Sequence, residues 1–381
     1  PKLTLLELAP DSIADEDYEG VFSGSRIETI ASDVYPEGML TEMPRLTTVI
    51  WNNADERMPD GRLTDAGNPN ILFWALDKDL APADAVNTVV FTDDDDAYGE
   101  AESIVLQAGY PFNAHRPFNV ATAEVIKEFT LPTEIGHSSG WETITLPFTA
   151  DSIMHETAGR ITPYAVWTGP EHPMKPFWLY GADAETETGW AADSIMRAGV
   201  PYIISMPNND EYVHAYNLPG KVRFVATDVT LGVAESLPKT VDWIEGAKFV
   251  GTFMPVEEEG IRSINVNELA GEEYLGSAFV PEDETLPFGA YITGEGLPSR
   301  IPVFGEWSGV LTVLEDGVGI VVETPAPGMI RVSGSRDCQV AIVTPEGAVI
   351  RTLSLKAGES VTEEGLTRGL YIVAGRKVMV R

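Results

Sequence analysis

Short runs of apolar residues recur along the first part of the chain. They begin at Leu3, Ile27 and Leu46, which are 24 and 19 residues apart, and polar segments with a bulky apolar residue separate them. One strand every ~20–29 residues is typical of a leucine-rich repeat. The spacing therefore predicts a degenerate leucine-rich-repeat-like segment over residues 1–92, with unrelated strands as the alternative. The residues expected in its core are Leu3, Leu5, Leu8, Ile27, Ile30, Leu46 and Val49.

The pattern changes after this segment. From residue 93 to residue 308 the apolar runs have the length of strands, Gly, Pro, Asn and Asp separate them, and no long run has the helical period. Such a pattern predicts an all-β sandwich-type domain over 93–308. The clearest predicted strands are residues 103–106, 143–146, 201–204, 221–225 and 248–251.

A third group of strand-like runs fills residues 309–381, where Asp-Gly, Pro-Gly and Glu-Gly pairs predict turns. We expect a small C-terminal β-sandwich of the Ig-like type, with strands at 311–314, 319–322, 329–332, 340–343 and 370–374. Alternation places Leu370 and Ile372 on one face of the last hairpin and Tyr371 and Val373 on the other. Residues 374–377 are its predicted turn and 378–380 its return strand. The predicted fold class is therefore mainly β.

A run of four aspartates at 93–96 marks the first predicted boundary. A calcium loop counted from Asp94 would have Tyr98 at its fifth position and Val105 at its twelfth, where a Glu is required. We therefore interpret the run as a solvated linker.

The charge balance narrows the range of partners. The chain has 25 basic and 59 acidic side chains and a net charge of −34. Nucleic-acid binding depends on neutralising phosphates with Lys and Arg, and attachment to anionic lipid has the same requirement. We therefore expect no nucleic-acid partner and interpret the charge as a solubilising surface, with cation binding as the alternative.

Cysteine and histidine are too few for a stapled or metal-bound fold. Cys338 is the single cysteine, and the five histidines are scattered, so we expect no internal disulfide, no metal site and no cofactor. No run approaches the ~20 apolar residues of a transmembrane span. The chain starts at Pro1 inside the repeat-like pattern, which fits an upstream region or signal peptide outside this sequence.

Three groups of segments carry a resemblance to a known family. The first joins residues 43–51 to 68–73, the second comprises 101–112, 140–148, 198–204 and 249–253, and the third comprises 340–347, 365–373 and 377–381. In these segments the chain resembles the leucine-rich-repeat, adhesin-like surface proteins of Bacteroidetes. They are similar to the family's closing repeat, its post-repeat β-domain and its C-terminal sorting-type domain, respectively. The resemblance implies export and a place outside the cell or on its outer surface, but it names no ligand.

One motif suggests catalysis. Residues 136–140 match G-x-S-x-G, in which Ser138 would be the nucleophile of an α/β-hydrolase. That elbow requires a helix after the second glycine, whereas residues 141–147 alternate like a strand and end at Pro147. We therefore predict a hairpin loop, a non-nucleophilic Ser138 and no enzymatic activity.

A cluster of aromatic residues is the remaining candidate site. Its members fall within 24 residues of each other and are interleaved with Gly and Pro. Exposed rings of this kind stack on sugars, whereas buried ones fill a core or a seam between domains. We expect a non-catalytic, secreted or surface-bound adhesion protein with a protein or glycan ligand; the alternative is a carbohydrate-binding accessory protein for polysaccharide capture. The candidate ligand-binding residues are Trp167, Trp178, Tyr180 and Trp190.

Overall fold

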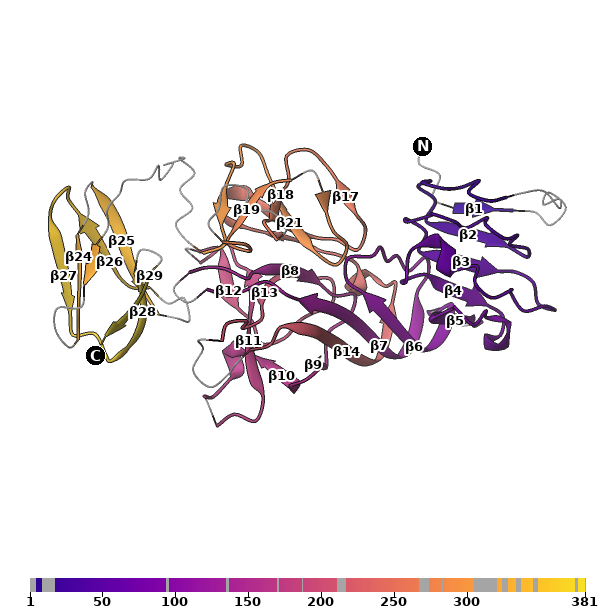
Figure 1. Cartoon of the computed structure of the whole chain (residues 1–381), viewed down its shortest axis with the longest axis horizontal. Helices are drawn as coiled ribbons and strands as arrows, with labels where there is room; N and C mark the ends of the chain where they lie inside the picture. Colours follow the sequence, from indigo (N-terminus) through magenta and orange to yellow (C-terminus); the bar gives the residue numbers. More distant parts are fainter. Residues whose placement is uncertain are drawn as a thin grey trace.

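The protein is described here as a computed structural model (Figure 1). The residues it describes are 5–8, 18–93, 96–134, 137–169, 171–186, 188–210, 217–266, 274–282, 284–304, 321–323, 328–333, 337–344, 349–373 and 376–380. Strands dominate these residues, and the helical elements among them are 3₁₀ turns of three residues. The mainly-β prediction is therefore confirmed. In the described part of the chain, no helix has the length and apolar character needed to cross a membrane.

The N-terminal strands form a parallel stack, in which each strand pairs with the next along the chain (Figure 1). The register places Leu5, Thr29, Thr48, Leu72 and Asn87 side by side, at steps of 24, 19, 24 and 15 residues. The first two steps are those seen in the sequence, and the last two strands extend the stack beyond them. The strands are β1 (Leu5–Glu7), β2 (Thr29–Ser32), β3 (Thr48–Trp51), β4 (Leu72–Ala75) and β5 (Asn87–Phe91).

One face of this parallel stack packs into a core of its own. Alternation along paired strands puts Leu6, Ile30, Val49 and Phe73 on the same face. The return segments contribute further apolar side chains to that core. Of the residues predicted there, Leu8, Ile27, Ile30, Leu46 and Val49 are present. Leu3 lies outside the described residues, and of Leu5 the structure describes the strand pairing alone.

The stack continues into one 14-stranded sheet, called the main sheet here. β5 and β6 pair in antiparallel fashion through Val90–Glu100 and Phe91–Gly99. The linker prediction for 93–96 is therefore wrong, because this segment connects the two strands of a hairpin; Asp94 and Asp95 lie outside the described residues. Beyond β5 the order is β6 (Gly99–Gln107), β7 (Phe118–Phe129), β14 (Gly220–Leu231), β9 (Ser152–His155), β10 (Gly159–Pro163), β11 (Lys175–Ala182), β13 (Pro201–Ser205) and β8 (Glu142–Thr145), with β12 (Trp190–Ala192) beside β11.

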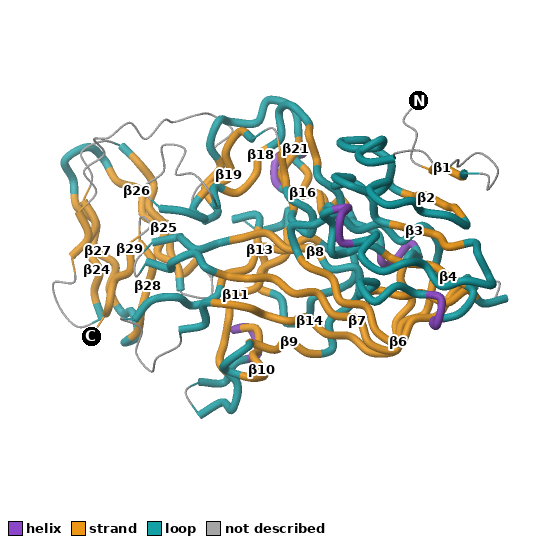
Figure 2. Tube along the Cα trace, turned by 45° about the vertical axis from the view of Figure 1, so that its right-hand side comes forward, coloured by secondary structure: helices purple, strands orange, loops and turns teal. Residues whose placement is uncertain are grey.

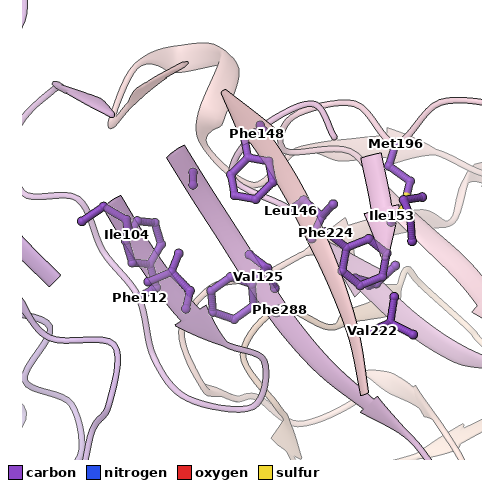
Figure 3. Packing of buried hydrophobic residues seen from close by; sticks show 14 of the residues in the cluster. Ile104, Phe112, Val125, Leu146, Phe148, Ile153, Met196, Val222, Phe224 and Phe288 are labelled. Carbon is purple, nitrogen blue, oxygen red and sulfur yellow. The ribbon is translucent and has the colours of Figure 1, made fainter. Parts of the chain in front are cut away.

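The inner face of the main sheet forms the largest core (Figure 3). Ile104, Val125 and Phe224, from β6, β7 and β14, are fully buried in it. β4 contributes to two cores, because Phe73 faces the core of the stack while Trp74 faces the main core. The Trp74 ring meets Phe118 edge-on at 5.5 Å. The parallel stack and the rest of the main sheet are thus packed together.

A second, six-stranded sheet, called the docked sheet here, lies against β8. The amide of Thr145 donates to the carbonyl of Phe288 at 2.8 Å, and the amide of Ala290 donates to the hydroxyl of Thr143 at 2.9 Å. A Cβ on Gly251 would lie 2.7 Å from Thr145 Oγ1, so the contact requires glycine there. Its strands are β15 (Thr240–Asp242), β16 (Lys248–Gly251), β21 (Ala290–Thr293), β18 (Arg262–Ile264), β19 (Ala278–Pro281) and β22 (Ile301–Pro302), and β17 (Val256–Glu257) pairs with β20 (Glu284–Thr285).

The C-terminal strands form two further sheets that share one core, to which Ile330 of the first sheet and Ile342 and Tyr371 of the second contribute. The first contains β23 (Val321–Glu323), β24 (Met329–Ser333) and β27 (Ser360–Glu364). The second contains β26 (Val349–Leu355), β25 (Cys338–Val343), β28 (Gly369–Val373) and β29 (Arg376–Val380). The strand predicted at 311–314 lies outside the described residues.

The last hairpin matches its predicted alternation but has a shorter turn. Tyr371 and Val373 are buried in the core, while Ile372 on the other face is half-buried. Val373 pairs with Arg376, so Arg376 and Lys377 belong to β29 and not to the predicted turn. The register leaves two residues for the connection.

Candidate functional site

The four aromatic residues predicted as ligand contacts lie in two different places. Trp178 and Tyr180 are on β11 and Trp190 is on β12, all three in or against the aromatic core between the main sheet and the docked sheet. Trp167 follows η4 (Tyr164–Val166), in the connection from β10 to β11. The cluster in the sequence is therefore divided in space.

Trp190 lies within the seam between the two sheets. Its side chain is surrounded by Trp243 at 5.1 Å, by Phe249 at 5.2 Å and by Phe279 at 6.1 Å between ring centroids. The residue is 3% exposed, so a ligand cannot stack on it. The prediction of a surface role for Trp190 is corrected: its ring packs the docked sheet onto β12.

Tyr180 has a similar position. It meets Trp141 and Phe304 edge-on at 5.6 Å and 5.2 Å and is 8% exposed. Alternation along β11 turns Phe177 and Leu179 into the main core and Trp178 and Tyr180 toward the docked sheet. Trp178, at the rim, stays half-buried and is the one ring of this strand that a ligand could reach.

Trp167 belongs to a surface turn that we call the aromatic turn, residues 164–167. The amide of Trp167 donates to the carbonyl of Tyr164 at 3.1 Å, which closes the turn. The two rings lie 5.5 Å apart with their planes inclined by 34°. Between them Val166 is 47% exposed. Figures 1 and 2 place η4 and the loop after it at the outer side of β10, away from the parallel stack and the docked sheet.

The sequence analysis overlooked Tyr164. Its spacing of three residues from Trp167, directly after Pro163, is the signal that could have revealed it, because residues i and i+3 of a 3₁₀ turn lie above one another.

The surroundings of Ser138 do not form a nucleophile. After Gly140 the chain enters β8, so the predicted strand is confirmed; Gly136 lies outside the described residues. The Ser138 hydroxyl oxygen is buried and has no hydrogen-bond partner. His137 instead lies against Tyr274, with 3.2 Å between Nε2 and the hydroxyl. A serine nucleophile requires a base within hydrogen-bond reach, which Ser138 does not have.

His155 is buried and serves the local structure. Its Nδ1 accepts hydrogen bonds from the amides of Thr157 and Ala158, and its Nε2 lies 3.1 Å from the carbonyl of Pro219. Both ring nitrogens are therefore engaged by the backbone. Within the described ranges, no three or more His, Cys, Asp or Glu side chains are grouped so that they could hold a metal ion.

The outer face of the parallel stack is covered where β3 and β4 meet the main sheet. The Thr48 hydroxyl donates to the carbonyl of Asn113 at 3.3 Å, and the Asn70 side-chain amide donates to the carbonyl of Tyr110 at 2.9 Å. Arg45 forms an ion pair with Glu257 beside these contacts, at 3.2 Å. This part of the stack therefore packs against the protein itself and offers no open face to a ligand.

Comparison of the chain with protein-family models, with curated proteins and with solved structures finds no match.

Proposed function

We propose that this chain is a non-catalytic binding or adhesion protein, secreted by a bacterium or held at its outer surface. The observation that carries the proposal is the parallel stack with its steps of 24 and 19 residues, followed along the chain by further β units. This is the order expected from the resemblance to leucine-rich-repeat surface proteins. On this interpretation the stack is a leucine-rich-repeat segment and the C-terminal strands are an Ig-like sorting sandwich.

The surroundings of Ser138 support a function without catalysis. The one motif that suggested a nucleophile leads into a strand, and its hydroxyl has no base beside it. The acidic surface supports a partner other than nucleic acid.

The covered face of the stack directs the search for the binding surface elsewhere. Repeat proteins commonly bind through the exposed strand face of the solenoid. Here contacts such as Thr48 to Asn113 occupy part of that face. The proposal therefore places ligand binding on exposed loops, which carry function in many proteins.

A carbohydrate-binding accessory role in polysaccharide capture is the second candidate function. The aromatic turn favours it, since Tyr164 and Trp167 hold two rings together at the surface.

Binding of the purified chain to an array of matrix proteins and to an array of glycans tests the proposal. Protein hits support the adhesion function, and glycan hits support the accessory function. Turnover of any arrayed ester or glycan would contradict a non-catalytic protein, and the Ser138→Ala variant would show whether the motif is responsible. An absence of binding on both arrays would contradict both candidate functions.

A further inference from the structure

We infer that Trp167, backed by Tyr164, is a stacking platform for a pyranose ring of a neutral polysaccharide. This inference rests on the proposed binding function and names its ligand class.

The geometry of the aromatic turn orients the indole before any ligand arrives. A centroid separation of 5.5 Å and an inclination of 34° are those of an offset ring pair, in which Tyr164 covers part of one indole face. The hydrogen bond from the Trp167 amide to the Tyr164 carbonyl keeps the two residues in register. A ring held in this way loses little conformational freedom on binding, which favours affinity.

The strands on either side anchor the turn in the main core. Ile161 of β10 and Phe177 of β11 are buried there and pair into the same parallel ladder. In the returning loop, the amide of Met174 donates to Nδ1 of His172 at 3.1 Å. The platform is therefore carried by rigid elements, as an accurate binding site requires.

The size of the apolar surface favours a sugar over a protein. A stable protein interface buries roughly 800 Å² on each partner. A turn with one indole, one phenol and Val166 is much smaller than that, but it is comparable to the C–H face of one or two sugar rings. Weak C–H contacts with an aromatic face also suit a pyranose, whose other edges carry hydroxyl groups.

The polar residues around the turn suit those hydroxyl groups and indicate a neutral ligand. Residues 164–169 carry no charge, and Thr168 and Glu171 are exposed beside the rings. A protein with a net charge of −34 repels anionic polysaccharides at a distance. A neutral chain that hydrogen-bonds through hydroxyls meets no such barrier.

The test is affinity electrophoresis of the full chain in gels that contain β-glucan, xylan or galactomannan, with polygalacturonate as the anionic comparison. We expect retardation by at least one neutral polysaccharide, little changed by salt. Trp167→Ala should weaken it about tenfold or more, and Trp167→Phe should retain part of it, because an aromatic contact contributes on the order of a factor of ten.

The control variant is Tyr110→Ala, which removes an exposed ring 43% accessible to solvent at another place on the surface. It should bind like the unchanged chain, and thermal unfolding should show both variants folded. Unaltered retardation of Trp167→Ala would overturn this inference and leave a glycan-binding function standing. Binding to matrix proteins alone, or to polygalacturonate alone in low salt, would overturn it in the same way. Binding to nothing would overturn the inference and the proposed function together.

Discussion

The ring of Phe112 lies 6.1 Å from the ring of Phe288, between centroids, and this contact joins the loop after β6 to the loop before β21 (Figure 3). The amide of Phe112 also donates to the carbonyl of Phe253 at 2.8 Å, so the three phenylalanines connect the main sheet with the docked sheet. Phe288 has a φ of +64°, a conformation that a bulky residue adopts only where its surroundings stabilise it. The junction is therefore a determinant of how the two sheets are held together.

We predict that Phe288→Ala strongly destabilises the protein. The side chain is fully buried, and truncation of such a ring costs about 3–5 kcal/mol through lost burial and the cavity that remains. Urea denaturation followed by tryptophan fluorescence measures the change. Leu286→Ala is the matched control, since this exposed residue of the same loop should alter the free energy of unfolding by at most ~0.5 kcal/mol. Equal effects of the two substitutions would contradict the role of the junction.

Asp84 gives the parallel stack a dependence on pH. Its carboxylate accepts hydrogen bonds from the amides of Gly61, Leu63 and Thr64, at 2.9, 2.9 and 3.0 Å. Burial opposes the charged form, but the backbone donors outweigh it and lower the pKa of Asp84 below its ordinary value. The stabilisation is complete above the unfolded pKa, about 3.9, and is lost as the pH falls through the lower folded pKa.

Asp84→Asn should therefore lower the free energy of unfolding at pH 7, and the difference from the unchanged chain should shrink as the pH falls below about 4. Denaturation curves at a series of pH values measure both effects. Asp55→Asn, in an exposed turn of the same stack, should change neither. A deficit of Asp84→Asn that stays constant down to the lowest pH would show that the charge of Asp84 is not what holds these turns.

The parallel stack and the aromatic cluster differ in how well the sequence alone could predict them. The stack was predictable because the apolar faces of Ile30 and Val49 recur at a regular distance in the chain, and each strand needs its neighbour to bury them. The position of Trp190 was not, because the side chains that cover it come from residues 243–279, far away in sequence. Alternation places Trp178 and Tyr180 on one face of β11, but only the docked sheet decides that this face is buried.

Two buried serines offer a direct comparison of hydrogen-bond satisfaction. Ser205 pairs with Trp178 across β13 and β11, is 1% exposed, and its hydroxyl has no partner. The hydroxyl of Ser236, also buried, donates to the carbonyl of Val233 at 2.8 Å. An unsatisfied buried hydroxyl costs about 1–3 kcal/mol, whereas a satisfied one contributes about 1 kcal/mol.

We therefore expect Ser205→Ala to raise the free energy of unfolding by about 1 kcal/mol and Ser236→Ala to lower it by a similar amount. Thermal and urea unfolding of the two variants measure these opposite signs. Destabilisation by both substitutions would mean that the Ser205 hydroxyl has a partner after all.

The last prediction concerns the C-terminal hairpin, where a structural role and an export role can be separated. Tyr371 pairs with Val378 and Gly369 pairs with Val380, so β29 completes the sheet. Val380 is fully buried in the C-terminal core. Deletion of residues 377–381 would leave β28 as an unpaired edge above an opened core. We expect a lower melting temperature of the C-terminal unit in the purified protein.

The resemblance to sorting-type domains predicts, in addition, that the same deletion retains the protein inside a Bacteroidetes host. Val380→Ala is the companion variant, because it opens a cavity costing about 1–3 kcal/mol but keeps the strand and its charged residues. If the hairpin is an export signal, the deletion abolishes secretion while Val380→Ala, equally or less stable than the unchanged chain, is still exported. If the hairpin is structural alone, secretion follows the melting temperature in both variants. A deletion that changes neither quantity would contradict the packing of β29 and its proposed role in export.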